Sequence, residues 1–91
     1  MSNNLEDTVK DAYIVYAENE GLSADEQQQR YTVLIQKADE LQQQYGGEKF
    51  AYRKFEYVKA IAAVIKEKEI IDALMKEGYV VKEQGRMRAQ N

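Results

Sequence analysis

The segment from residue 50 to residue 59 holds the side chains best suited to binding a ligand. Its aromatic and basic residues are Phe50, Tyr52, Arg53, Lys54, Tyr57 and Lys59. Aromatic rings stack on nucleic-acid bases, and arginine and lysine neutralise phosphates, so this mixture indicates nucleotide or nucleic-acid binding. However, Glu48 and Glu56 dilute the positive charge, and the start of an amphipathic helix gives the same pattern. We therefore keep nucleic-acid binding as an alternative function.

Catalytic chemistry has few candidate residues in this chain. The 91 residues include no His and no Cys, which removes imidazole bases, thiolate nucleophiles, and the nitrogen and sulfur ligands of zinc and copper. Carboxylate pairs remain, such as Asp25 with Glu26, but neighbours on a helix point in different directions. The Gly46–Gly47 pair lacks the lysine and hydroxyl of a phosphate-binding loop. We predict that the protein is not an enzyme and has no catalytic, cofactor or metal site.

Helical periodicity predicts that helices carry these residues. A first helix is expected over residues 4–19, where Leu5, Val9, Tyr13 and Tyr16 recur at helical spacing. A second helix is expected over residues 24–45. It has a capping box at its start, in which Ser23 and Glu26 can satisfy two free backbone amides.

The apolar stripe of the second helix is the clearest in the chain. It consists of Tyr31, Leu34, Ile35, Ala38, Leu41 and Tyr45. Gly46–Gly47 would end this helix in a short turn, so that a third helix over residues 49–77 returns antiparallel to it. The core of this helical hairpin is predicted to contain Leu34, Ile35, Ala38, Leu41, Val58, Ile61 and Ile65.

The sequence thus predicts an all-α fold in one domain, residues 1–91. The expected architecture is a small bundle of three helices around an antiparallel helical hairpin. It becomes four if the charged run Lys66–Glu69 divides the third helix, which the pattern leaves open. Residues 79–91 are predicted to be a short non-helical tail, with a hairpin from Tyr79 onward as the alternative.

A second apolar stripe on the third helix predicts a partner surface. It is formed by Ile70, Ile71, Leu74 and Met75. On a continuous helix this stripe points about 100° away from the stripe around Ile61 and Ile65. One hairpin partner cannot cover both stripes, and an exposed apolar patch usually marks an interface. We therefore expect self-association, with a homodimer favoured, or binding of another protein at this patch.

Charge and hydropathy constrain the partners and the compartment. The formal net charge is −3, with an acidic first half and a basic second half, which suits packing of the halves together better than strong nucleic-acid binding. No apolar run approaches the roughly 18 residues of a membrane span, and residues 1–7 lack the basic and apolar regions of a signal peptide. The lack of cysteine fits a reducing cytoplasm, although a secreted helical protein without cysteines would look the same. We expect a cytoplasmic protein with no membrane partner.

Two short motifs resemble those of the WXG100 family of secreted proteins. Tyr45–Gly46–Gly47 resembles the family's Trp-x-Gly turn, and Tyr79–Glu83 resembles its Tyr-x-x-x-Asp/Glu export signal. The resemblance covers the whole chain and implies a dimeric helical hairpin that a type VII system secretes. The family's Trp is Tyr45 here, and Gly21 and Ser23 interrupt what would be one long first helix.

The function predicted from these patterns is binding without catalysis. The chain is expected to act as a small helical interaction module, that is a regulator, inhibitor or adaptor that binds another protein, itself, or both. The alternatives are a WXG100-like exported protein and a nucleotide-binding or nucleic-acid-binding protein that uses residues 50–59.

Overall fold

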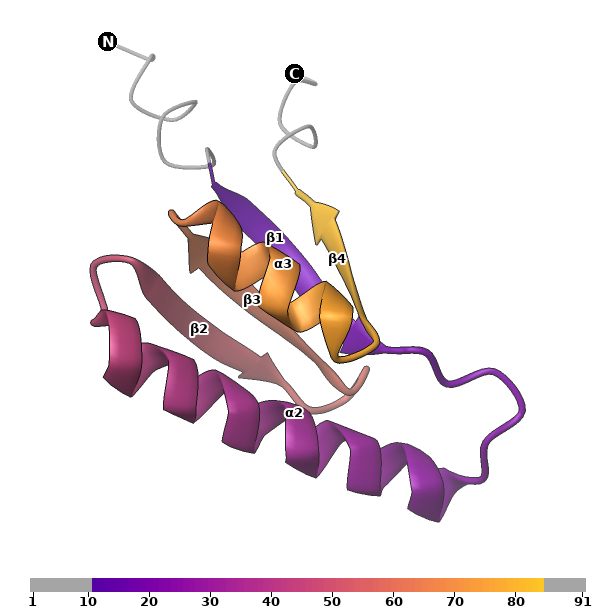
Figure 1. Ribbon diagram of the computed structural model, residues 1–91. Helices are drawn as coiled ribbons and strands as arrows, with labels where there is room; N and C mark the ends of the chain where they lie inside the picture. The colour runs from indigo at the N-terminus through magenta and orange to yellow at the C-terminus, as the bar shows by residue number, and fades with distance from the viewer. Residues whose placement is uncertain (1–10, 85–91) are drawn as a thin grey trace, which may run out of the picture.

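The computed structural model describes residues 11–84 and has an α+β architecture (Figure 1). The elements in chain order are β1 (Ala12–Ala17), α2 (Ala24–Tyr45), β2 (Phe50–Phe55), β3 (Ala60–Ile65), α3 (Lys68–Lys76) and β4 (Tyr79–Glu83). The strands form one sheet in the order β2-β3-β1-β4, and every neighbouring pair is antiparallel. This connectivity is that of the ferredoxin-like, or split βαβ, motif.

The predicted all-α bundle and its helical hairpin are therefore wrong. Helix accounts for 42% and strand for 31% of the described residues, whereas three helices were expected to cover most of the chain. Only the helix over 24–45 is confirmed as it was predicted. The first predicted helix contains β1, the third divides into β2, β3 and the shorter α3, and the predicted tail begins with β4. The parts of these predictions that fall on residues 1–10 and 85–91 lie outside the described residues.

The strands were misread because their sequences are apolar on both faces. β1 reads Ala-Tyr-Ile-Val-Tyr-Ala, and β3 reads Ala-Ile-Ala-Ala-Val-Ile. A short apolar run of this kind fits a buried strand and a buried helix equally well. Alanine also has the highest helix propensity, which tertiary pairing overrides here. Sheet pairing decides the outcome, and it depends on residues far apart in the sequence.

The strand register assigns each side chain to one of two faces. Val15 lies beside Ile61 and Val81 in one row across the sheet, and Ile14 lies beside Ala62 in the next row. Val15 and Ile61 are fully buried. Because neighbouring residues of a strand point to opposite faces, Ile14 and Ala62 belong to the face away from that core.

Both helices pack on the face that carries Val15 and Ile61. The core cluster consists of Val15, Leu34, Ala38, Leu41, Phe50, Ile61, Ala63, Ile65, Ile70 and Leu74. It joins residues of α2 and α3 to residues of β1, β2 and β3, with α2 along β2 and α3 over the sheet (Figure 1). Five of the seven predicted core residues are buried here and Ile35 packs against them, but Val58 is 60% exposed in the β2–β3 turn.

The start of α2 has the capping box that the sequence predicted. The Ser23 hydroxyl accepts a hydrogen bond from the Glu26 amide at 3.2 Å, and the Glu26 carboxylate accepts one from the Ser23 amide at 3.0 Å. At the other end, the Gly46 amide donates to the Gln42 carbonyl at 2.8 Å, and Gly46 has φ 90°, which favours glycine. The chain then enters β2, so Tyr45–Gly47 forms a turn from a helix into a strand and not the hairpin turn that the WXG100 resemblance implies.

We predict that Ser23→Ala destabilises the protein by about 1 kcal/mol, whereas Ser23→Gly costs only a few tenths of that. The alanine removes the hydroxyl that accepts the Glu26 amide, while glycine leaves that amide open to water. Urea denaturation of the three proteins measures both differences. Equal midpoints would show that Ser23 does not cap α2.

Replacing Leu41, which is buried between α2 and the sheet, by alanine should cost about 2–5 kcal/mol, because it leaves a cavity in the core. Val33→Ala on the same helix is the control, since Val33 is exposed. Denaturation midpoints report both. If Leu41→Ala has no larger effect than Val33→Ala, Leu41 is not part of the core.

Candidate functional site: the open face of the sheet

The aromatic and basic segment predicted as a ligand surface is divided between two faces of the sheet. Phe50 is fully buried in the core, and Tyr52 also lies on the helix side, where its hydroxyl donates to Asp39 at 2.7 Å. Arg53 points to the opposite face and is exposed. Lys54 is exposed at the edge of the helix side. Strand alternation thus prevents these side chains from forming one binding surface.

The remaining two residues of that segment lie in the turn between β2 and β3. Tyr57 is 97% exposed. Lys59 adopts a left-handed conformation with φ 58°, and its ammonium donates to Gln28 at 2.7 Å and lies 5.7 Å from the centroid of the Tyr31 ring. These contacts attach the turn to the first half of α2. Lys59 therefore has a structural role here.

The apolar stripe predicted as a partner surface lies mainly inside the protein. Ile70 and Leu74 are fully buried, and Ile71 packs against the core cluster. Met75 is 55% exposed and alone remains well accessible. The prediction of an exposed stripe rests on one continuous helix from residue 49 to residue 77. Because α3 is a separate helix, its apolar stripe faces the sheet.

The large uncovered surface is the face of the sheet opposite the helices. It carries Ala12, Ile14 and Tyr16 of β1, Ala51, Arg53 and Phe55 of β2, Ala60, Ala62 and Val64 of β3, and Val80 and Lys82 of β4. We call this surface the open face. No helix of residues 11–84 lies over it, and Phe55, Arg53, Val64 and Lys82 are exposed.

The open face has an apolar floor and positively charged edges. Alanines line much of β3, and larger side chains stand on both sides of them, so that the surface is shallowly hollowed. One hollow of about 230 Å³ is lined by Ala12, Ala51, Tyr52, Arg53, Ala62, Ala63, Val64 and Gln84. None of the positions of the open face carries a carboxylate.

Exposed apolar residues continue from the open face into the β2–β3 turn. Phe55, at the end of β2, is 40% exposed and lies in the same row as Tyr16 and Val80. Tyr57 and Val58 follow it in the turn and are more exposed still. The turn therefore extends the apolar surface beyond the sheet.

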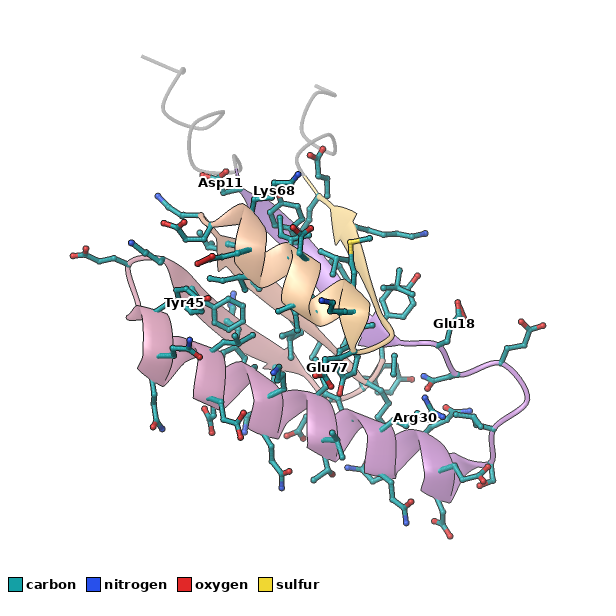
Figure 2. All side chains as sticks on the ribbon, viewed as in Figure 1. Asp11, Glu18, Arg30, Tyr45, Lys68 and Glu77 are labelled. Atoms are coloured by element: carbon teal, nitrogen blue, oxygen red, sulfur yellow. The ribbon has the colours of Figure 1, made fainter. Side chains whose placement is uncertain are left out.

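The helix side of the molecule is polar at its periphery and offers a second hollow of similar volume. Figure 2 shows the labelled side chains of Arg30, Tyr45 and Glu77 on this side, and the Tyr45 hydroxyl donates to Glu69 at 3.3 Å. The hollow, of about 250 Å³, lies between α2 and the α3–β4 turn and has Arg30 and Glu77 in its lining. Lys37 approaches Glu77 at 3.9 Å. Opposite charges therefore share this lining, which favours no one kind of ligand.

The charged side chains of residues 11–84 lie at the surface and form no cluster that could hold a metal ion. Within this range, no three histidine, cysteine, aspartate or glutamate side chains gather closely enough to hold a metal ion. No charged side chain is buried in the described part of the chain either. None of the described helices has the length and apolar character needed to span a membrane.

Comparison of the chain with protein families, with characterised proteins and with solved structures found no match.

The open face escaped the sequence analysis, which treated its residues as parts of helices. A signal for it was present in two places. Residues 12–17 and 60–65 are apolar runs of six, a typical strand length, and each is flanked by charged or turn-forming residues. Reading them as paired strands would have assigned Ile14 and Ala62 to one face and Val15 and Ile61 to the other.

Tyr52 joins β2 to α2 and has a strongly altered acidity. Burial of the ring, the hydrogen bond to Asp39 and the negative charge of Asp39 raise the pKa of Tyr52 from 10.0 to about 12. The folded state thus holds the phenol proton more tightly than the unfolded chain does. The stabilisation is complete below pH 10 and is lost as the pH rises toward 12.

We predict that Asp39→Asn lowers the pKa of Tyr52 below about 12, because the amide still accepts the hydrogen bond but carries no charge. The pKa should stay above 10.0, since the ring remains buried. Titration of the Tyr52 ring carbons by NMR measures it. Glu40→Gln is the control, as it removes one charge from the neighbouring position of α2. An unchanged pKa in Asp39→Asn would contradict the contact.

Proposed function

We propose that this chain is a non-enzymatic protein-binding module, acting as a regulator, inhibitor or adaptor, and that it binds its partner through the open face. The observation that supports this most directly is an apolar sheet face that no element of residues 11–84 covers. A contiguous exposed apolar patch of this kind usually marks a protein interface. Aromatic residues and arginine are enriched in such interfaces, and Phe55, Tyr16 and Arg53 lie here.

Nucleic-acid binding is less well supported by the same face. Four-stranded sheets that read RNA stack bases on aromatic side chains of their central strands. The central strands here are β3 and β1, and the positions at their middle are Ala62 and Ile14. Neither offers a ring on which a base can stack, and Tyr16, near the end of β1, is the one aromatic residue that the two central strands place on the open face. The net charge of −3 also disfavours a nucleic-acid partner.

Export as a WXG100-like protein has no support from the fold. The resemblance implies a helical hairpin, and the described residues instead form a sheet with two helices. The predicted export motif, Tyr79–Glu83, is strand β4 and pairs with β1.

Self-association was favoured by the sequence, but it fits the open face less well than a different partner does. A second copy would bring its own Arg53 and Lys82 against those of the first, and the face has no carboxylate to pair with them. Four cations would then meet in one interface, and like charges at an interface oppose association. We therefore favour a heterotypic partner.

Site-specific photo-cross-linking tests the proposal. The photoreactive residue p-benzoylphenylalanine replaces Phe55 on the open face or, as the control, Met75 on α3, in cells of the organism from which the sequence comes. Both side chains are exposed, but they lie on opposite sides of the sheet. We expect a protein adduct from position 55 and none from position 75, because only the open face is proposed to bind.

Other outcomes would change the conclusion. Adducts from position 75 alone would indicate that the partner binds at α3 and not at the open face. No adduct from either position would contradict the protein-binding function. An adduct of twice 10.5 kDa from position 55 would show that the partner is a second copy of the chain.

A further inference from the structure

Two cations stand on opposite edges of the open face, at the same level of the sheet. Arg53 of β2, Ala62 of β3, Ile14 of β1 and Lys82 of β4 form one row across the four strands. With about 4.8 Å between neighbouring strands, the two cationic residues are separated by roughly 14 Å. Both are exposed, and neither forms a salt bridge with another residue of 11–84.

The surface between the two cations has the dimensions of an α-helix. A helix with its side chains is about 10–12 Å wide, which fits between Arg53 and Lys82. The small side chain of Ala62, at the middle of β3, allows a close approach to the sheet, whereas Ala60 is already buried. A strand of six residues is about 20 Å long, and roughly 14 residues of helix cover that length.

Backbone hydrogen bonding favours a helix over an extended segment at this surface. A strand or loop laid flat on an apolar face would lose water from its amides and carbonyls without gaining partners, which is costly. The backbone groups of a helix are already paired with one another. An extended segment would find free backbone groups only at the edges of the sheet, along β2 or β4.

We propose that the open face binds an amphipathic α-helix of the partner protein, with carboxylates on both flanks of its apolar stripe. This inference rests on the proposed protein-binding function and specifies the partner. The apolar stripe lies over Ala62 and Ile14, and the flanking carboxylates pair with Arg53 on one side and Lys82 on the other. The two charge pairs determine the position of the helix between β2 and β4, while the apolar contact supplies most of the binding free energy.

Titration of the ¹⁵N-labelled full chain with two synthetic helical peptides tests this inference by NMR. Both peptides are 15 residues long with the same leucine and alanine stripe, and their flanks carry either glutamate or lysine. We expect the glutamate peptide to bind at least about fivefold more tightly at low salt, with the difference shrinking at high salt. The shifted amides should lie in β1 and β3.

Charge-reversal variants distinguish the effect of Arg53 and Lys82 on peptide binding from the effect of the net charge. In Arg53→Glu/Lys82→Glu the preference should invert, so that the lysine peptide binds more tightly. Lys54→Glu/Lys76→Glu makes the same change in net charge. Lys54 lies on the helix side of β2, and Lys76 is exposed at the end of α3, so this control should keep the preference for glutamate.

The outcomes distinguish this inference from the function on which it rests. Equal binding of the two peptides, or a control that inverts the preference as well, would overturn the role of Arg53 and Lys82. Failure of both peptides to shift the open face, while position 55 still cross-links to another protein in cells, would overturn the helix and leave the protein-binding function standing. Shifts confined to β2 or β4 backbone amides would instead indicate an extended partner at a sheet edge.

Discussion

The pairing of β1 with β3 is the contact on which the rest of the structure depends. These are the two central strands, and each contributes a fully buried side chain, Val15 and Ile61, to the same row. A shift of one residue in this register would bring Ile14 and Ala62 to the helices and expose the present core. The register therefore determines both the core and the chemistry of the open face, and neither can change without the other.

The two helices cover one face of the sheet and leave the other open. The first half of α2 holds the β2–β3 turn through Lys59, and its second half holds β2 through the hydrogen bond between Asp39 and Tyr52. The short α3 buries Ile70 and Leu74 over the sheet. The described part of the chain has no third helix with which to cover Ile14, Phe55 and Val80. An apolar face without a covering element is typical of a surface that binds another molecule, as proposed above.

The features that could be predicted from the sequence are those that depend on residues close together in the chain. Ser23 and Glu26 lie together at the start of α2, and Gly46 directly follows its last residue, so these local signals determine the bounds of α2. Residues 12–17 and 60–65 do not contain the information that they pair, because the pairing joins segments about 50 residues apart and the apolar residues fit either period. Five core residues were still predicted correctly, since a buried apolar side chain stays buried whether its segment is a helix or a strand.

The residues of the predicted ligand and partner surfaces are divided between two faces or buried for a related reason. Neighbouring residues can share one broad side of a helix, but in a strand they point to opposite faces. Tyr52 and Arg53 therefore point in opposite directions. Ile70, which was predicted to be exposed on a long helix, packs instead against the sheet. The candidate site could thus be identified only after the secondary structure was known.

Charge is distributed unequally between the two sides of the molecule. α2 carries Asp25, Glu26, Asp39 and Glu40 on the helix side, whereas the charged residues of the open face are Arg53 and Lys82. An acidic partner is therefore repelled by one side of the chain and attracted by the other. Such an arrangement orients an approaching partner before contact, and the apolar face then retains it. The net charge of −3 conceals this asymmetry, and only the sheet register shows that the two cations share a face.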